Sequence, residues 1–141
     1  MTRTLILGVL ALLMPVLAIP GRLPAEEKTP AKRIDVEQFD KMRHDKGTVV
    51  LDVRTKQEYE QGHVPGSANI DINDPQFRKK VGELDHSRTY LVHCASGVRS
   101  DRAVRMMSAM GFSNLFDFHG GFRAWKQSGK PIEKGPETAA K

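Results

Sequence analysis

Short apolar runs alternate with helix-like patterns along most of this chain. In the helix-like segments, apolar residues recur at three- and four-residue spacing, as in Ala103, Met106, Met107 and Met110. This alternation predicts an α/β domain with a mainly parallel central sheet and helices on both faces. The runs that predict strands cover residues 33–34, 48–53, 67–72, 89–93 and 115–118.

Capping patterns fix where several of the helices begin. Asp35 and Gln38 have capping-box spacing and predict a helix that runs to about residue 44, and Thr55 and Glu58 repeat the pattern. Asp74 followed by Pro75 has the order of a cap and a first helical residue, which predicts a third helix there.

The first 25 residues have the layout of a secretory signal peptide. A short basic start precedes a 15-residue uncharged run from Leu5 to Ile19, and small and turn-prone residues follow. The alternative is an uncleaved membrane anchor, although the run is short for a spanning helix. We therefore expect a signal peptide (1–25), a linker (26–32), one domain (33–128) and a polar C-terminal tail (129–141) that frays, in an exported protein, periplasmic or secreted.

The net charge and the cysteine content narrow the range of possible functions. The formal net charge is +5, and removal of residues 1–25 would take away Arg3 and Arg22, leaving +3. A surplus of this size suits a protein that attracts small anions. The chain has no basic run with interleaved aromatic residues, so a nucleic acid partner is not expected. Cys94 is the only cysteine. An exported chain with one cysteine cannot form an internal disulfide, which leaves an inert thiol or a reactive one.

Cys94 follows an apolar strand pattern and precedes a helix expected to begin near Ser100. Ligands of parallel sheets bind beyond the carboxyl ends of the strands. Backbone N–H groups at a helix start favour a thiolate and bound anions. The sequence therefore predicts a reactive Cys94 that handles an anion.

The spacing after Cys94 argues against phosphate chemistry. A phosphate-binding cysteine loop has five residues between Cys and Arg, whereas four separate Cys94 from Arg99. The smaller ring of N–H groups should fit a single sulfur atom better than a phosphate. Phosphoester cleavage also needs a general acid, and none is evident near the loop in sequence.

Three stretches of the chain resemble the rhodanese family of sulfurtransferases, in particular its single-domain members. Residues 50–54, continued through 58–70, resemble the first signature, and Cys94 to Ser100 resembles the active loop. Gly111-Phe112, Gly120-Gly121-Phe122 and Trp125 resemble the closing signature. The likeness covers about residues 33–128.

The resemblance implies that sulfane sulfur moves from thiosulfate through a Cys94 persulfide to cyanide or a thiol. Arg99 would add a cation where the donor docks, and Ser100 would cap the helix, donate to the persulfide, or both. Asp52 and Arg54 would support the loop as an ion pair. No metal or cofactor is expected. His93 and the methionines are expected to be packing residues, and His63 is expected to be a turn residue. The residues expected to surround the persulfide are Ala95, Ser96, Gly97, Val98, Arg99 and Ser100.

Two other functions stay open. One is a non-catalytic persulfide carrier or binding module, since a carrier and a catalyst need the same loop. The other is a phosphatase or arsenate reductase on the same scaffold. The expected partners are a small anionic sulfur donor, thiosulfate or 3-mercaptopyruvate, and a cyanide, thiol or protein-thiol acceptor. A membrane would be a partner only if residues 1–25 stay attached.

Overall fold

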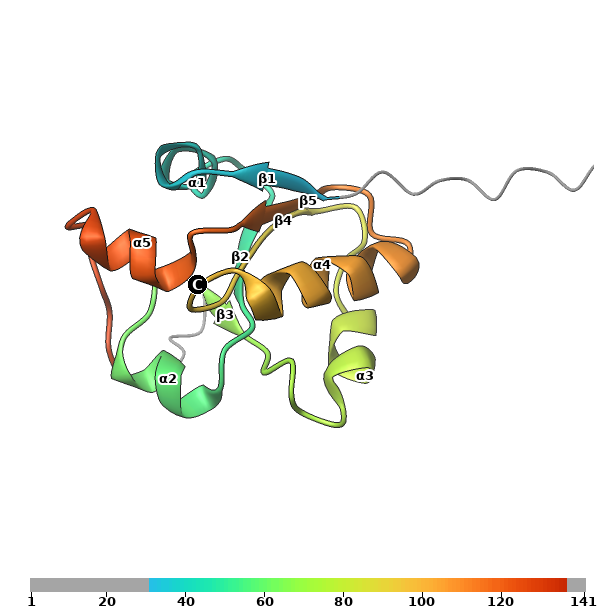
Figure 1. Cartoon of the computed structure of the whole chain (residues 1–141). Helices are drawn as coiled ribbons and strands as arrows, with labels where there is room; N and C mark the ends of the chain where they lie inside the picture. Colours follow the sequence, from blue (N-terminus) through green and yellow to red (C-terminus); the bar gives the residue numbers. More distant parts are fainter. Residues whose placement is uncertain (1–30, 137–141) are drawn as a thin grey trace, which may run out of the picture.

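In a computed structural model, which describes residues 31–136, five parallel strands form one sheet in the order β1-β5-β4-β2-β3 (Figure 1). The predicted α/β class with a parallel sheet is confirmed. The strands are β1 (Lys32–Ile34), β2 (Thr48–Asp52), β3 (Ala68–Asn69), β4 (Thr89–His93) and β5 (Leu115–Phe118).

Helices cover both faces of this sheet and bury two separate apolar clusters. Phe39 and Trp125 pack on one face with Leu91, whereas Val81 and Met107 belong to the cluster on the other. The helices of the first face are α1 (Val36–Met42) and α5 (Gly121–Gln127), with α2 (Lys56–Gln61) on the same side; those of the second are α3 (Phe77–Gly82) and α4 (Val98–Ala109) (Figure 1).

The strand predictions were accurate for β4 and β5 and too long for β3. β4 and β5 have the predicted bounds, while β3 is only Ala68–Asn69. Beyond β3, single backbone bonds continue the pairing, from the Ile70 N–H to Asp52 O and from the Ile72 N–H to Val53 O. The side chain of Asn69 donates to the backbone of β2, which fixes this edge strand without a longer ladder.

Both predicted capping boxes are present, at Asp35 and Thr55. The prediction for α3 was wrong, because Asp74 does not cap it. The Asp74 carboxylate accepts the N–H of Gln76 in a local turn, so the helix begins after Gln76. The prediction for α4 was also wrong by two residues, since Gly97, with φ +100°, precedes a helix that begins at Val98.

A segment after α5 packs against the domain, so the expectation that the chain frays from residue 129 was wrong for its first part. The Lys130 ammonium pairs with two carboxylates of α1. The carbonyl of Pro131 accepts a 2.7 Å hydrogen bond from the buried indole of Trp125. His63 and Glu133 exchange backbone hydrogen bonds. We call residues 130–135 the C-terminal strap.

The predicted signal peptide and residues 26–30 of the predicted linker lie outside the described residues. Within residues 31–136, none of the helices combines the length and the apolar character that a bilayer crossing requires. Lys32, the last residue of the predicted linker, is the first residue of β1.

Candidate active site

Cys94 lies directly after β4, at the carboxyl edge of the sheet, and its side chain is buried. The N–H of Gly97 donates to Cys94 Sγ at 3.1 Å. The hydroxyl of Ser100, in the first turn of α4, lies 3.7 Å from the same sulfur. The loop therefore wraps around the thiol as its position after a central parallel strand predicts.

The start of α5 holds this loop in shape. The N–H groups of Phe122 and Arg123 donate to the carbonyls of Cys94 and Ala95, at 2.8 and 3.0 Å. These contacts turn the carbonyls toward α5, away from the sulfur. A Cβ at Gly121 would lie 2.6 Å from the Cys94 carbonyl oxygen, and Gly121 has φ +61°. Gly121, the first residue of α5, is thus required for the approach of this helix to the loop.

The loop amides decide the ionisation of Cys94. Burial raises the pKa of the thiol, but hydrogen bonds from the backbone N–H groups of Ser100, Ser96 and Gly97, with a smaller contribution from the Ser100 hydroxyl, outweigh it. The net effect is a pKa below the ordinary value of a cysteine. The site therefore favours the thiolate, which is the nucleophilic form.

Ser100 does not cap α4, because Gly97 occupies the cap position. Its hydroxyl instead lies 2.7 Å from Oδ1 of Asp117 on β5 and 3.2 Å from the Gly97 carbonyl oxygen. Sequence reasoning missed Asp117. The available signal was a lone acidic residue inside an otherwise apolar strand, Leu115–Phe118, where a buried charge needs a partner.

Asp52 and Arg54 form the predicted ion pair beside the loop, and we call it the inner pair. Arg54 Nη2 lies 2.6 Å from Asp52 Oδ2, and both side chains are buried. Arg54 also donates to the carbonyl of Gly62 and packs on the ring of Phe122. The inner pair thus ties β2 to the end of α2 and to α5, while Arg54 also lines the cavity beside the loop.

A second acid–arginine pair, the outer pair, was not predicted. Arg99 of the loop makes two hydrogen bonds to Glu58 of α2, at 2.7 and 2.8 Å. These bonds from Arg99 lower the pKa of Glu58 to about 2. Glu58 also completes the capping box with Thr55, as predicted. Arg99 lies at the predicted place, but its charge is paired rather than free for an anion.

A cavity of about 510 Å³ lies beside the loop, where Ala95 forms part of its wall. The strap contributes Ile132 and Lys134 to the lining. Cationic side chains outnumber the single carboxylate, that of Glu58, among the lining residues. The cations are Arg54, Arg123, Lys126 and Lys134. The approach to the loop is therefore positively charged.

The remaining candidate residues are packing residues, which was the expectation for His93 and the methionines but not for His63. His93 is fully buried, burial lowers its pKa, and its Nδ1 lies 3.2 Å from the Cys94 carbonyl oxygen. His63 stacks on Tyr59. Met107 is buried in the core. Among residues 31–136, acidic, histidine and cysteine side chains form no cluster that could hold a metal ion.

Comparisons with known proteins agree with this geometry. The family model of the Rhodanese-like domain matches residues 35–128. The chain is 33% identical over 98 residues to the thiosulfate sulfurtransferase GlpE of Pseudomonas syringae, covering 70% of this chain and 90% of that protein. It is 32% identical over 106 residues to the "Putative sulfur carrier protein YrkF" of Bacillus subtilis, covering 74% of this chain but only 56% of that protein.

Among solved structures, a rhodanese-related protein from Thermoplasma volcanium superposes with a TM-score of 0.65 at 33% identity. The alignment covers 72% of this chain and 97% of that protein. The strand order, the cysteine loop and these similarities agree, and the chain belongs to the rhodanese family.

Proposed function

We propose that this protein is a sulfurtransferase that takes the sulfane sulfur of thiosulfate onto Cys94 and passes it to a thiophilic acceptor. The observation that carries the proposal is the Gly97 N–H bonded to Cys94 Sγ inside a loop with only four residues between Cys94 and Arg99. Relatives named thiosulfate sulfurtransferase support the choice of donor.

The first step forms a persulfide. The Cys94 thiolate attacks the outer sulfur of thiosulfate, a new S–S bond forms, and the S–S bond of thiosulfate breaks. Sulfite leaves with the bonding electron pair, and the terminal sulfur on Cys94 carries the negative charge. The N–H groups that lower the pKa of the thiol would also stabilise this anion.

The second step regenerates the thiolate. A nucleophile such as cyanide attacks the terminal sulfur, the S–S bond to Cys94 breaks, and thiocyanate leaves. Sulfite and the Cys94 thiolate are weakly basic leaving groups, so neither step requires a proton donor. His93, the histidine next to Cys94, is buried with its Nδ1 directed at a carbonyl, which fits this account.

The charged cavity beside the loop supports an anionic donor. Arg123, Lys126 and Lys134 line it, and they would raise the local concentration of a dianion such as thiosulfate. Because Glu58 neutralises Arg99, we infer that attraction comes from the cavity lining more than from the loop arginine.

A persulfide carrier is the second candidate, favoured by the similarity to a protein named as a sulfur carrier. The two functions differ in the second step only. A carrier would accept sulfur from thiosulfate and release it to small acceptors very slowly, whereas a sulfurtransferase turns over with cyanide or a small thiol.

We further propose that residues 1–25 direct export, so that the domain works in the periplasm or outside the cell. The layout of the segment is the support. Fractionation of expressing cells and N-terminal sequencing test this. Full-length protein in the cytosol would contradict it.

One experiment tests the central proposal. Treatment with thiosulfate should add the mass of one sulfur atom to the intact protein, and cyanide should remove it and yield thiocyanate. Cys94→Ser should show neither change, and since Cys94 is the only cysteine, the adduct has one expected position. Undiminished thiocyanate formation by Cys94→Ser would overturn the mechanism, and turnover of an aryl phosphate would favour the phosphatase alternative.

A further inference from the structure

Asp117 is a buried carboxylate directly behind the active loop. Its side chain is 1% exposed, and Oδ1 lies 2.7 Å from the hydroxyl of Ser100. The other oxygen, Oδ2, has no hydrogen-bond partner among the described residues and lies 3.5 Å from Nδ1 of His119. A buried carboxylate needs hydrogen-bond partners, and the hydroxyl of Ser100 supplies one to Oδ1.

The hydroxyl of Ser100 has one proton and three neighbours. Oδ1 of Asp117 and the carbonyl oxygen of Gly97 are acceptors only, and the carboxylate is the nearer at 2.7 against 3.2 Å. The third neighbour is Cys94 Sγ, at 3.7 Å. A charged acceptor forms the stronger bond, so the proton lies toward Asp117 and a lone pair of the hydroxyl faces the sulfur.

We propose that Asp117 is a positioning residue that keeps the Ser100 hydroxyl as a hydrogen-bond acceptor toward Cys94. The hydroxyl then accepts the S–H of the thiol and gives little to the thiolate. The sulfur anion is stabilised mainly by backbone N–H groups and keeps more of its nucleophilicity than it would with a fully donated O–H bond.

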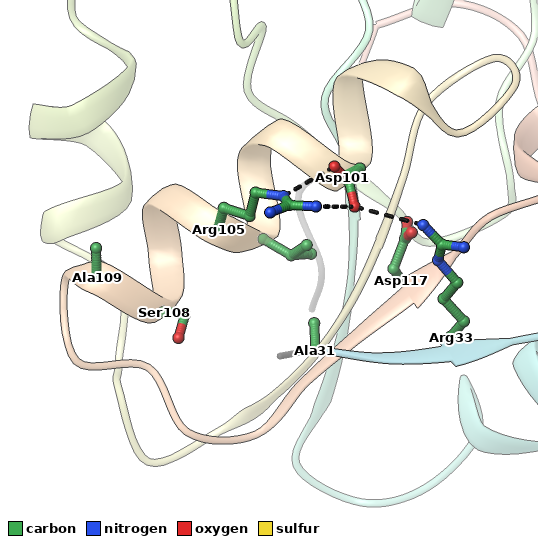
Figure 2. A pocket seen from close by; sticks show the side chains of 8 residues that line it. Ala31, Arg33, Asp101, Arg105, Ser108, Ala109 and Asp117 are labelled. Atoms are coloured by element: carbon green, nitrogen blue, oxygen red, sulfur yellow. Dashed lines mark hydrogen bonds and ion pairs between the residues drawn. The ribbon is translucent and has the colours of Figure 1, made fainter. Parts of the chain in front are cut away.

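The other charges around Asp117 do not take over this role. Behind it lies a groove of about 480 Å³ between α4 and β1, and Arg105 and Arg33 both pair there with Asp101 (Figure 2). Neither arginine forms an ion pair with Asp117. Nδ1 of His119 lies 3.5 Å from Oδ2, the oxygen that does not bond Ser100, and the same histidine packs against Gly97 of the loop.

The proposal rests on Cys94 as the reacting group of the proposed function, but its test measures thiol reactivity and not sulfur transfer. The pKa of the single thiol follows from the rate of alkylation by iodoacetamide as a function of pH. Asp117→Ala frees the Ser100 proton to bond the thiolate. We expect the pKa of Cys94 to fall by about one unit.

Removal of a nearby negative charge would also lower that pKa through space, and a double-mutant cycle separates the two effects. In a Ser100→Ala background, we expect Asp117→Ala to shift the pKa by less than about a third of its effect in the wild type. Equal shifts in both backgrounds, no shift, or a rise in the wild type would overturn the proposal.

Two further variants keep the test decisive. Asp101→Ala, which removes a carboxylate of the same groove that does not contact Ser100, is the matched control and should leave the pKa unchanged. If Asp117→Ala fails to fold, the pKa of Cys94 in the Ser100→Ala variant is the deciding measurement. A hydroxyl that donates to the thiolate would, when removed, raise the pKa by about one unit, and that result would overturn the proposal; an unchanged or lower pKa supports it.

Discussion

Two acid–arginine pairs flank the same loop and differ mainly in burial. The inner pair, Asp52 and Arg54, is almost fully enclosed, with side chains 0% and 5% exposed. The outer pair, Glu58 and Arg99, is about a third exposed, at 35% and 27%. Both have short, multiple hydrogen bonds, so bond geometry alone does not distinguish them.

The difference shows that burial, and not the number of hydrogen bonds, decides whether such a pair serves the architecture of the site or its electrostatics. Removing one partner of a buried pair leaves an uncompensated charge in the core, whereas water replaces the lost partner at the surface. We therefore assign the inner pair to the architecture of the site and the outer pair to the electrostatics of its entrance. The following predictions test this division.

The largest expected effect is on stability. Asp52→Asn should lower the free energy of unfolding by about 3–5 kcal/mol, because Arg54 would remain buried without a carboxylate. Urea unfolding followed by circular dichroism measures it. A loss no larger than that of Glu58→Gln would show that the inner pair is not the structural one.

The next effect is on donor binding. Arg99→Ala leaves the Glu58 carboxylate unneutralised beside the loop, and we expect the KM for thiosulfate to rise about tenfold with little change in kcat. Steady-state kinetics at low and high salt measure this, because added salt should reduce the difference. Arg102→Ala on the exposed part of α4 is the matched loss of one positive charge. An equal rise in that variant would contradict a specific role for Arg99.

A smaller effect is expected when the outer pair is broken without loss of the helix cap. Glutamine can replace glutamate in a capping box, so Glu58→Gln removes the charge and keeps the bond to the backbone of Thr55. We expect a loss of about 0.5–1 kcal/mol in the free energy of unfolding. A loss above about 3 kcal/mol would mean that the outer pair behaves as a buried one.

The smallest expected effect is the change with pH in the stability that Glu58→Gln loses. Arg99 lowers the pKa of Glu58 from 4.5 to about 2 in the folded protein. A depressed folded pKa means that the stabilisation is complete above pH 4.5 and is lost as the pH falls toward 2. The stability difference between wild type and Glu58→Gln should therefore shrink in that window. A difference that stays constant down to pH 3 would contradict the assignment.

Features that depend on residues close together in the sequence were predicted, whereas contacts between residues far apart in the sequence were not. The bounds of β4 and β5 and both capping boxes depend on neighbouring residues, and they were predicted correctly. These strands and caps lie within the reach of periodicity and spacing. The inner pair, which the structure contains, was expected only from the resemblance to the rhodanese family.

Contacts between distant residues were missed. Glu58 and Arg99 are 41 positions apart, and Ser100 and Asp117 are 17 apart. Each pair meets because strands and helices of the parallel sheet bring their ends to one edge, and no local pattern states which side chains then face each other. The same reason explains why the role of Ser100 stayed open between a helix cap and a donor to the persulfide: its partner on β5 was not visible from the sequence around it.

Because the C-terminal strap packs against the domain, the folded domain is longer than the segment that matches the family model. The family similarity ends at residue 128, yet Trp125 completes its hydrogen bonding with Pro131, and the backbone of His63 is bridged by Glu133. A version of this domain that stops at residue 128 would leave a buried indole N–H without an acceptor. Fusions and domain transplants that use this protein should therefore be joined after residue 136, and family boundaries are a poor guide to where its fold can be cut.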